Sequence, residues 1–506
     1  MDKILSFDIG TTAIKTCVFD RALRLTAIRT DEYDLVTEPG RVEMDPDTYW
    51  NTMRTALAGI AGEEDLSEVR AICLTTQGET MIPVDAAGVP LHNAVVWLDD
   101  RAKDQAEQIR KTVTPKELYG RTGVTDMNGF VPLAKLLWFR QEQPDLYEST
   151  YKFMLLEDYL LYRLTGRFVT EKSLLTSTAW YDIRHDGYWT ELLQKLGLDA
   201  EKLPEILDCG QLVGTLTSQA ALDLGLSTQV QVFAGAMDQI AAAIGGGGIG
   251  EGVVTATVGT AMVLTAAIPS MDDCTNSDLI VYRGIRKGQY VLLPLCNTAG
   301  SVFKWYKDHC SALLAAQCRQ TGEDVYDLLC REAADSAPGA NGVILLPYFA
   351  GSMQPHLIPE AKGVFYGLSL TTEHKDMTRA VLEAIGYMLR ENLEMLQKFG
   401  KRPARIHFFG GGSKNPMWNQ IIADITGVEL VLLEQSECGS LGAAMIGAVS
   451  MGWYCSVEEV QRCNAVRGVV KPDPKLRGVY DAAYRRYQIL LKTMIPVFNE
   501  LRGDFV

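Results

Sequence analysis

Two short segments about half a chain apart repeat one pattern, a Gly-Thr turn between two apolar runs. Residues 7–12 read Phe-Asp-Ile-Gly-Thr-Thr, and residues 257–261 read Thr-Val-Gly-Thr-Ala. Such a turn offers backbone N–H groups and a threonine hydroxyl to an anion, and its glycine lets the backbone approach that anion closely. Only the first copy carries an acid, Asp8, where the second has Thr257. The pattern predicts two phosphate-holding turns, one for a metal–phosphate group and one for phosphate alone, and therefore a two-domain nucleotide-dependent phosphotransferase.

Length, charge and cysteine content narrow the class of protein. A chain of 506 residues is too long for one ordinary hydrophobic core, and two large domains would match the duplicated turns. The formal net charge of −15 argues against nucleic acid and anionic membranes as partners, because both need a basic surface. The 11 cysteines include no Cys-x-x-Cys pair, so we expect reduced thiols rather than disulfides or a zinc site.

The sequence has no evident targeting or membrane segment. Residues 1–3 lead directly into an apolar strand pattern without the arrangement of a signal peptide, which predicts a cytoplasmic protein. The weakly polar stretch 230–268 is rich in glycine and alanine and is interrupted by charged residues. This composition suits a buried core better than a membrane span.

The order of apolar patterns is that of an α/β protein. Residues 153–164 have the apolar spacing of a helix, and a strand at 230–234 leads into an alanine-rich helix. The strand pattern restarts after the glycines of 245–250, so we expect two domains, 1–246 and 247–506. Further elements are expected in the second half, as strands at 253–257, 261–265, 406–409 and 430–433 and as helices at 376–399, 416–426, 441–449 and 475–498.

Two common nucleotide motifs are excluded. Gly245, Gly247 and Gly250 match the spacing Gly-x-Gly-x-x-Gly, but they follow a helix and precede a strand, whereas the dinucleotide motif follows a strand and opens a helix. A hinge is the better interpretation of these glycines. No Gly-x-x-x-x-Gly-Lys-Ser/Thr sequence is present, so the chain is not a P-loop enzyme.

Two acids admit both a structural and a catalytic interpretation. Asp8 ends an apolar strand, where it can cap the turn or hold Mg²⁺ through water, and the neighbouring Thr11 and Thr12 favour the metal role. Asp238 stands between a strand and a helix, where it can be an N-cap or can accept the proton of a hydroxyl that is being phosphorylated. The two interpretations of Asp238 are compatible.

Three loops that follow strands carry groups suited to ligands. The run 410–415, Gly-Gly-Gly-Ser-Lys-Asn, would let the backbone approach a flat ring or a phosphate, or would simply form a tight loop. Residues 77–80, Gln-Gly-Glu-Thr, and residues 97–101, Trp-Leu-Asp-Asp-Arg, mix amide, acid, aromatic and guanidinium groups. Together these groups suit a polyhydroxylated ligand, although each loop alone is more often an ordinary surface loop or ion pair.

Taken together, these segments resemble the FGGY carbohydrate kinase family, which includes xylulokinase and glycerol kinase within the actin/hexokinase-like superfamily. The similarity covers nearly the whole chain in order. It is carried by Asp8-Ile-Gly-Thr-Thr, Gly40-Arg-Val-Glu-Met-Asp-Pro46, Trp97-x-Asp-x-Arg101, Arg163-Leu-Thr-Gly166, Gly235-Ala-Met-Asp238-Gln239, Val258-Gly-Thr260, Ala361-Lys-Gly363, Phe409-Gly-Gly-Gly-Ser413 and Gly439-Ser-Leu-Gly-Ala-Ala444. The resemblance implies an α/β fold of two ribonuclease-H-like domains around a central cleft. It also implies that the first domain, 1–246, binds the sugar and carries the catalytic aspartate, and that the second, 247–506, binds ATP.

The resemblance also implies roles for single residues, with ATP and Mg²⁺ as cofactors. Asp238 resembles the general base, and Asp8 resembles the carboxylate on the Mg²⁺ side. The residues expected to contact the nucleotide are Thr11, Thr12, Gly259, Thr260, Gly411, Gly412 and Asn415. The residues expected to contact the acceptor, a small sugar or polyol, are Gln77, Glu79, Trp97, Phe130 and Gln239. Phe130 stands where glycerol kinase has a tyrosine. The resemblance does not decide between a monomer and a homodimer.

The substrate depends on departures from the family pattern. Glycerol kinase has Gln-Arg-Glu-Thr where this chain has Gln77-Gly78-Glu79-Thr80, and the Met-His pair of xylulokinase is replaced by Gly78-Glu79. Loss of the arginine opens space and favours an acceptor longer than glycerol. The leading hypothesis is therefore ATP-dependent phosphorylation of a primary hydroxyl on a small sugar, first a ketopentose such as xylulose, with glycerol or a tetritol such as erythritol as the alternative. A non-catalytic sugar or nucleotide sensor and an ATPase acting on protein partners are the further alternatives.

Overall fold

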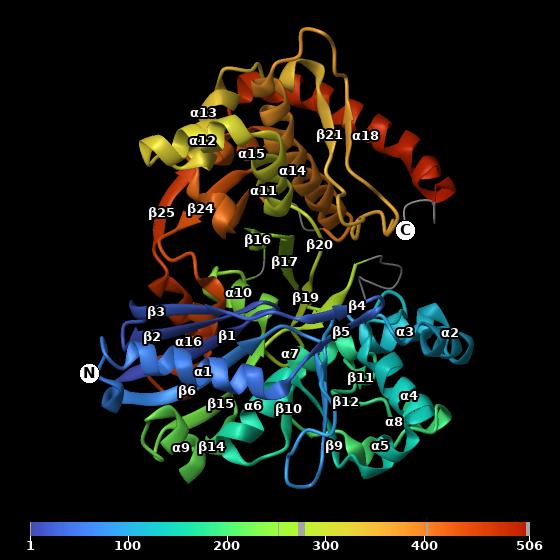
Figure 1. The fold of residues 1–506 in the computed structure, drawn as a ribbon, viewed down its shortest axis with the longest axis vertical. Helices are drawn as coiled ribbons and strands as arrows, with labels where there is room; N and C mark the ends of the chain where they lie inside the picture. Colours follow the sequence, from blue (N-terminus) through green and yellow to red (C-terminus); the bar gives the residue numbers. More distant parts are fainter. Residues whose placement is uncertain (1, 251, 272–278, 401–402, 502–506) are drawn as a thin grey trace. The chain divides into compact units, whose positions relative to one another are not determined.

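The computed structural model describes residues 2–250, 252–271, 279–400 and 403–501 (Figure 1). The chain forms two compact units, each discontinuous in sequence. Unit 1 consists of Met1–Ile249, Ala267–Val291 and Glu437–Asn464, and unit 2 consists of Gly250–Ala266, Leu292–Ser436 and Ala465–Val506. Two segments that follow residue 246 in the chain therefore belong to unit 1.

The main sheet of unit 1 has the strand order β3-β2-β1-β6-β15-β14. β1 and β15 both run parallel to β6, whereas β2, β3 and β14 run antiparallel to their neighbours. The strands are β1 (Lys3–Ile9), β2 (Ala13–Asp20), β3 (Leu25–Glu32), β6 (Val69–Thr76), β14 (Leu212–Thr215) and β15 (Gln231–Met237). The three parallel strands therefore end at the same edge of the sheet.

The two faces of β1 pack against different helices. Leu5, Phe7 and Ile9 are fully buried in the core that includes the apolar residues of α1 (Pro46–Ile60). The alternate residues of the strand, Asp8 among them, lie on the opposite face. On that face α16 (Cys438–Ser450) packs along β1 and β6. Because β1 is covered on both sides, its sequence is an almost continuous apolar run.

The packing of α16 against α10 (Asp238–Gly245) explains why residues 437–464 join unit 1. A side chain at Gly442 would overlap the carbonyl oxygen of Ala241, and one at Gly245 would overlap the backbone of Cys438. Glycines at these positions let the two helix backbones come into direct contact. This contact joins residues about 200 positions apart and has no local signal in the sequence.

Smaller elements complete unit 1. A second sheet has the order β4-β5-β8-β7-β9, and β10 pairs with β13, β11 with β12. The strands are β4 (Val36–Glu38), β5 (Arg41–Met44), β7 (Met81–Val84), β8 (Ala94–Val95), β9 (Lys152–Leu155), β10 (Val169–Glu171), β11 (Tyr181–Asp182), β12 (Gly187–Tyr188), β13 (Glu205–Leu207), β18 (Val281–Arg283) and β19 (Tyr290–Leu292). The remaining helices are α2 (Lys103–Thr112), α3 (Pro115–Thr122), α4 (Pro132–Glu142), α5 (Pro144–Ser149), α6 (Leu156–Thr165), α7 (Lys172–Leu175), α8 (Thr190–Lys195), α9 (Ser218–Leu224) and α17 (Val457–Val460).

The sheet of unit 2 repeats the arrangement of the main sheet of unit 1. Five of its strands lie in the order β17-β16-β23-β24-β25, and β20 pairs with β17. Here β16 and β24 run parallel to β23, whereas β17, β20 and β25 run antiparallel to their neighbours. The strands are β16 (Val254–Val258), β17 (Met262–Ile268), β20 (Leu295–Cys296), β23 (Arg405–Phe409), β24 (Glu429–Leu433) and β25 (Val466–Val470). The order and direction of β17, β16, β23, β24 and β25 match those of β2, β1, β6, β15 and β14. Each Gly-Thr turn therefore joins the first two strands of one copy of the same arrangement.

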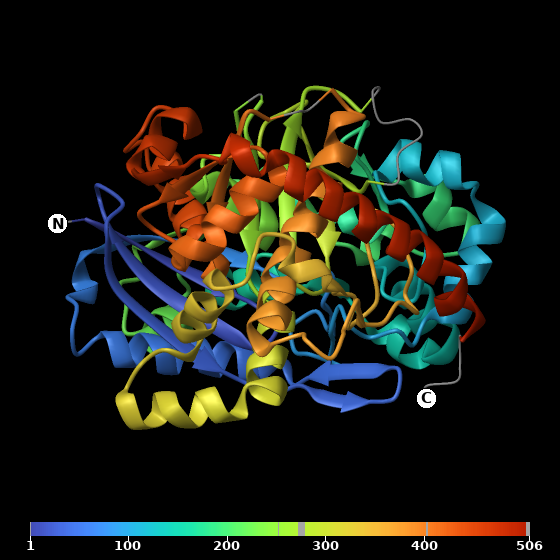
Figure 2. The same ribbon diagram turned by 90° about the horizontal axis from the view of Figure 1, so that it is seen from above.

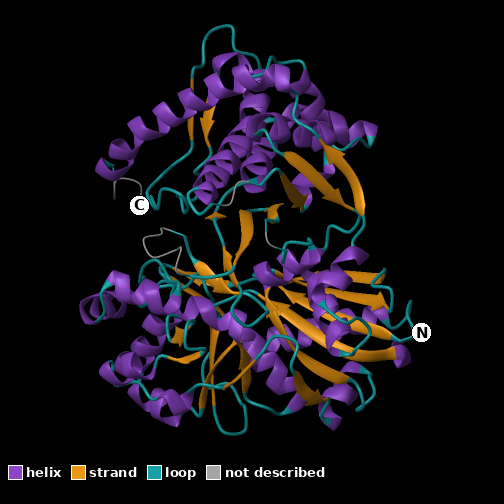
Figure 3. Ribbon diagram, turned by 180° about the vertical axis from the view of Figure 1, so that it is seen from behind, coloured by secondary structure: helices purple, strands orange, loops and turns teal. Residues whose placement is uncertain are grey.

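The helices of unit 2 pack around this sheet and around one another (Figure 3). They are α11 (Gly300–Cys310), α12 (Ala312–Thr321), α13 (Val325–Ala334), α14 (His374–Gln397), α15 (Pro416–Thr426) and α18 (Arg477–Glu500), with a short hairpin of β21 (Ile344–Leu346) and β22 (Val364–Tyr366). Figure 2 shows α18, in red, as one long helix near the C-terminus. Within the described residues, no helix has the length and apolar character that crossing a membrane requires.

One expected helix begins later than its apolar spacing suggests. Residues 153–155 belong to strand β9, which pairs with β7, and only then does α6 begin, at Leu156. Apolar spacing cannot separate a buried strand from the buried helix that follows it directly. Pairing with β7 decides the outcome.

Candidate active site

The candidate site of unit 1 lies at the edge where the three parallel strands end. Asp8 on β1 and Ala236 on β15 both pair with Thr75 of β6. The residues that follow these positions, Gln77 to Thr80 after β6 and Asp238 after β15, therefore emerge beside Asp8. Open α/β sheets commonly bind their ligands at such carboxyl ends.

Asp8 is a half-buried carboxylate held between charged neighbours. It lies directly opposite Lys15 on β2, and the Lys15 ammonium forms an ion pair of 2.5 Å with Glu437, the residue before α16. Burial raises the pKa of Asp8 to about 6, with Lys15 opposing and Glu437 adding to the shift. An added Cβ at Gly439, in the first turn of α16, would stand 2.7 Å from Asp8 Oδ2. The glycine thus keeps the space beside this carboxylate free.

Asp238 is the first residue of α10 and is also half-buried. The N-cap position belongs to Met237, and Asp238 Oδ1 accepts a hydrogen bond of 2.7 Å from the N–H of Gln239. Burial, and then the negative charge of Asp8, raise the pKa of Asp238 to about 7. A carboxylate with such a pKa can take up a proton near neutral pH, which is what a general base must do.

Further polar and aromatic side chains belong to the predicted site in unit 1, and the charge of Glu79 acts on Asp238. Glu79 has a φ of +70°, an unusual backbone conformation for this residue type, and burial raises the pKa of its carboxyl. Trp97 is half-buried, and its indole N–H donates a 3.0 Å hydrogen bond to Thr11 Oγ1 in the first Gly-Thr turn. Gln77 is buried, and its Oε1 accepts no hydrogen bond from the described residues, which leaves one acceptor for a ligand or water.

The remaining predicted residues of unit 1 are less constrained. Phe130 is 38 % exposed, and Gln239 is half-buried at the start of α10. Thr12 is exposed, and its carbonyl oxygen accepts a 3.0 Å hydrogen bond from Tyr33 N–H, which holds the turn in place.

Three further residues near this site were missed in the sequence. Lys135 on α4 is fully buried, donates a 2.9 Å hydrogen bond to the carbonyl of Val96, and has its pKa lowered to about 8 by burial. Its charge acts on Glu79, as does the hydroxyl of Ser177. Tyr282 on β18 lies close enough to feel the charges of Glu79 and Asp238. A lysine between apolar helix neighbours was a usable signal for Lys135, whereas Tyr282 lies beyond the predicted domain boundary.

The candidate site of unit 2 is built from the second Gly-Thr turn and the glycine run. The N–H of Gly300, the first residue of α11, donates a 2.8 Å hydrogen bond to the carbonyl of Gly259. A side chain at Gly412 would stand 2.8 Å from a methyl of Val258, so the run packs directly on the turn. Gly259, Thr260 and Gly411 are exposed, and no atom lies within 4 Å of a Cβ added at either glycine. The turn and the run thus present open backbone side by side.

Asn415 lines a pocket of about 450 Å³ between α13 and the start of α15. Its Oδ1 caps α15 by accepting from the N–H of Met417 and of Trp418, and its Nδ2 donates a 2.9 Å hydrogen bond to Asp327 on α13. The volume is that of a small-molecule site.

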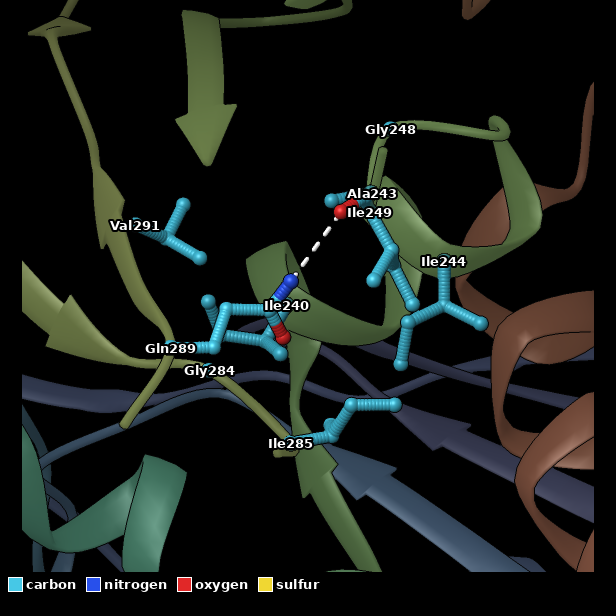
Figure 4. Close-up of a pocket in the computed structure, with 9 residues that line it drawn as sticks. All are labelled: Ile240, Ala243, Ile244, Gly248, Ile249, Gly284, Ile285, Gln289 and Val291. Atoms are coloured by element: carbon cyan, nitrogen blue, oxygen red, sulfur yellow. Dashed lines mark hydrogen bonds between the residues drawn. The ribbon is translucent and has the colours of Figure 1, made fainter. Parts of the chain in front are cut away.

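A second cavity, in unit 1, is too small to bind a small molecule. It has a volume of about 10 Å³ and apolar walls from α10 and from residues 284–291, where the Gln289 side chain donates a 3.0 Å hydrogen bond to the carbonyl of Ile249 (Figure 4). A space of this size holds one water at most. It is a packing gap behind α10.

Comparison with known proteins identifies the family. Residues 3–245 match the model of the FGGY family of carbohydrate kinases, N-terminal domain, and residues 254–451 match the C-terminal domain of the same family. The chain belongs to the FGGY family of carbohydrate kinases. It is an ATP-dependent sugar kinase, as the combination of both domains and its relatives shows.

Relatives of this FGGY kinase differ in their substrates. The xylulose kinase of Staphylococcus xylosus is 28% identical over 461 residues, covering 91% of this chain and 93% of that protein. The gluconokinase of Bacillus subtilis is 24% identical over 500 residues, covering 98% and 95%. The crystal structure of ligand-bound xylulose kinase from Lactobacillus acidophilus superposes with a TM-score of 0.90 at 24% identity, covering 99% of this chain and 100% of that one. The actin/hexokinase-like fold is thereby confirmed.

Proposed function

We propose that this kinase transfers the γ-phosphoryl group of ATP to a terminal primary hydroxyl of a neutral ketopentose, with xylulose as the expected substrate. The observation that carries the proposal is Asp238, a half-buried carboxylate with a pKa of about 7. The predicted site also contains amide, acid and aromatic side chains, which are the groups that commonly bind sugars. The similarity to a xylulose kinase over more than nine-tenths of the chain supports the choice of sugar.

Asp238 is the proposed general base. Its carboxylate would accept the proton of the acceptor hydroxyl while the oxygen attacks the γ-phosphorus in line. Trp97 offers an aromatic face to the carbon chain of the sugar, while Glu79, Gln77 and Gln239 offer partners for its hydroxyl groups. Phe130, which is partly exposed, would cover the apolar side of the ligand.

The charges around Asp238 favour a neutral sugar over an aldonate. Asp8, Glu79 and Asp238 are acids, and the charges of both Asp8 and Glu79 raise the pKa of Asp238 after burial has done so. Lys135, a fully buried cation whose charge acts on Glu79, donates its hydrogen bond to the carbonyl of Val96. A gluconate carboxylate would therefore meet like charges without a free cationic partner among the described residues of this cluster.

The space at Gly78 favours an acceptor longer than glycerol. An added Cβ at this position would only touch Met237 and Ser177, at 3.7 Å each, so the position could hold a side chain and instead leaves room. A tetritol is the second candidate because its shorter carbon chain would fill only part of the space at Gly78.

Unit 2 is the proposed nucleotide-binding unit. Gly259 and Thr260 would hold phosphate oxygens, and Gly411, Gly412 and Asn415 would hold adenosine at the 450 Å³ pocket. In unit 1, Thr11 and Thr12 are the proposed phosphate contacts of the first turn. The pocket has the size of a nucleoside site, and Asn415, one of the residues matched to the family pattern, lines it.

Asp8 is the proposed contact on the Mg²⁺ side. The described residues contain no group of three or more histidine, cysteine or acidic side chains that could hold a metal ion alone. Mg²⁺ in phosphoryl-transfer sites needs only one or two carboxylates, because water and substrate phosphates complete its shell. The space that Gly439 keeps beside Asp8 fits such a group. Bound there, the ion would neutralise charge on the phosphates.

The test is ADP release with a panel of acceptors. The proposal expects turnover with xylulose to exceed that with ribulose, erythritol, glycerol and gluconate, and expects the product to carry phosphate on a terminal carbon. Preference for gluconate or glycerol would overturn the substrate, and binding of sugar without any ADP release would favour a sensor. ADP release that no sugar stimulates would indicate an ATPase. The cytoplasm, which supplies ATP, is the proposed location.

A further inference from the structure

The strand that leads into Asp238, β15, is irregular shortly before its end. Phe233 of β15 pairs with Cys73 and Ala236 pairs with Thr75, so Ala234 and Gly235 together stand opposite the single residue Leu74. Such a bulge bends a strand and re-aims the residues that follow. A side chain at Gly235 would overlap the Leu74 carbonyl oxygen, so only glycine fits.

Buried side chains hold the backbone of this bulge on all sides. Gly235 N–H donates a 2.8 Å hydrogen bond to Glu157 Oε1 on α6, and Met237 N–H donates one of 3.0 Å to Ser173 Oγ on α7. Thr75 Oγ1 donates a 2.8 Å hydrogen bond to the carbonyl of Ala236 between them. Residues 235–237 are thus held at three successive positions, and Asp238 is the next residue.

Ser173 is itself fixed by a buried acid. Its hydroxyl donates a 2.8 Å hydrogen bond to Glu171 Oε1, while Glu171 Oε2 accepts from Ser173 N–H at 2.6 Å and from the thiol of Cys209 at 2.8 Å. Glu157, Glu171 and Ser173 are all fully buried. The hydroxyl can therefore only point its lone pairs toward Met237 N–H.

Placing two acids in this position is costly. Burial raises the pKa of Glu157 well above its ordinary value, and the neighbouring Glu171 raises it further. Burial raises the pKa of Glu171 as well. Oε1 of Glu157 accepts the Gly235 N–H in this environment. Buried acids with strongly shifted pKa values gather at functional sites.

We propose that Glu157 and the Ser173–Glu171 pair are positioning residues that hold the bulged backbone of β15 and thereby aim Asp238 at the acceptor hydroxyl. The inference rests on the proposed role of Asp238 as general base. It adds the groups that fix the position of Asp238. Catalytic rates depend steeply on such geometry, since a displacement of about 1 Å can cost about 10²-fold.

The first test compares two buried serines, one that accepts a hydrogen bond from the backbone of β15 and one that does not. Ser173→Ala removes the acceptor of Met237 N–H, whereas Ser6→Ala removes an equally buried hydroxyl on β1 that makes no hydrogen bond within the described residues. We expect kcat to fall at least about tenfold in Ser173→Ala with the KM values for sugar and ATP within about threefold. Ser6→Ala keeps kcat within about twofold. Equal kcat values in the two variants, at matched Tm, would overturn the proposal.

The second test uses the oxygen of Glu157 that accepts the Gly235 N–H. Glu157→Gln keeps an acceptor oxygen for Gly235 N–H, whereas Glu157→Leu has a similar volume and none. Glu157→Gln should retain kcat within about threefold and Glu157→Leu should lose at least about tenfold. If Glu157→Gln is as slow as Glu157→Leu, the acceptor oxygen is not what matters and the proposal is wrong.

A third measurement separates positioning from a general loss of structure. In the Asp238→Asn background, Ser173→Ala should cause less than about a twofold further loss of kcat, because the group it positions is already gone. A further tenfold loss there contradicts the proposal. If Asp238→Asn itself retains turnover, the general-base assignment fails instead, so the two failures are distinguishable.

Discussion

Asp8 lies on β1 and Asp238 directly follows β15, the two strands that flank β6, and the negative charge of Asp8 raises the pKa of Asp238. Burial, and then Asp8, raise the pKa of Asp238 to about 7, while burial raises the pKa of Asp8 to about 6. When two acids lie near each other at a partly buried edge of a sheet, ionisation of one opposes ionisation of the other. The edge is therefore suited to a reaction that brings in a cationic group with the nucleotide and takes a proton from an alcohol.

The pH dependence of turnover follows from this pair. Because the general base must be deprotonated, kcat should rise with pH through a midpoint near 7 and level off above about pH 8. The negative charge of Glu79 also raises the pKa of Asp238, so Glu79→Gln should move the midpoint of kcat to lower pH at saturating sugar. A midpoint near 4, the value for an unburied aspartate, would contradict the assignment, as would a shift to higher pH in Glu79→Gln.

Gly439 tests the space beside Asp8. In Gly439→Ala the new Cβ would stand 2.7 Å from Asp8 Oδ2, so the carboxylate must move. We expect roughly a tenfold loss of kcat, together with a higher Mg²⁺ requirement. The matched control is Gly447→Ala in the same helix, whose Cβ would make ordinary contacts of 3.4 to 3.6 Å and should raise stability by about 0.5–1 kcal/mol. Normal Mg²⁺ dependence in Gly439→Ala would remove Asp8 from the metal side.

Gly78 tests the length of the acceptor. Its φ is not in the left-handed region, and an added Cβ has room, so Gly78→Arg can fold and would fill the vacant space with a guanidinium. The KM for xylulose should rise at least about tenfold while that for glycerol changes less. Gly78→Ala, which adds only the Cβ, serves as the control and should stay within about threefold. An equal effect on both acceptors would show that this position does not select for length.

Ala334 tests the nucleotide pocket of unit 2. It is an exposed residue of α13 that lines the 450 Å³ pocket, so Ala334→Trp can fill the pocket without disturbing the core. We expect the Kd for ADP to rise at least about tenfold and the KM for sugar to stay unchanged. Ala334→Ser is the control, and calorimetric titration of ADP is the measurement. Unchanged ADP binding in Ala334→Trp would place adenosine elsewhere.

The sequence predicts the parts of the site that are local. Gly10 and Gly259 form the expected turns, the strand at 406–409 leads into the glycine run, and Asp238 follows the end of a strand. Each of these features needs only a strand, a turn residue and its neighbours. The duplication of the turns also matches the order of five strands that the two sheets share.

The sequence does not predict the parts that depend on distant packing. The helix at 438–450 reads as a member of the second domain, but its glycines dock it on β1 and α10 of unit 1. Tyr282 joins unit 1 for the same non-local reason. The Glu157–Gly235 hydrogen bond connects residues 78 positions apart, and nothing in the apolar spacing around Glu157 marks it as a partner of the bulge.

The most direct test of the account is the turnover of Asp238→Asn. The substitution keeps the size of the side chain and removes its ability to accept a proton, so kcat with the preferred sugar should fall at least about 10³-fold. Binding of ADP, followed by calorimetry, should be largely retained. Turnover within about tenfold of the unmodified enzyme, with ADP binding intact, would contradict the role of Asp238 as the general base of this kinase.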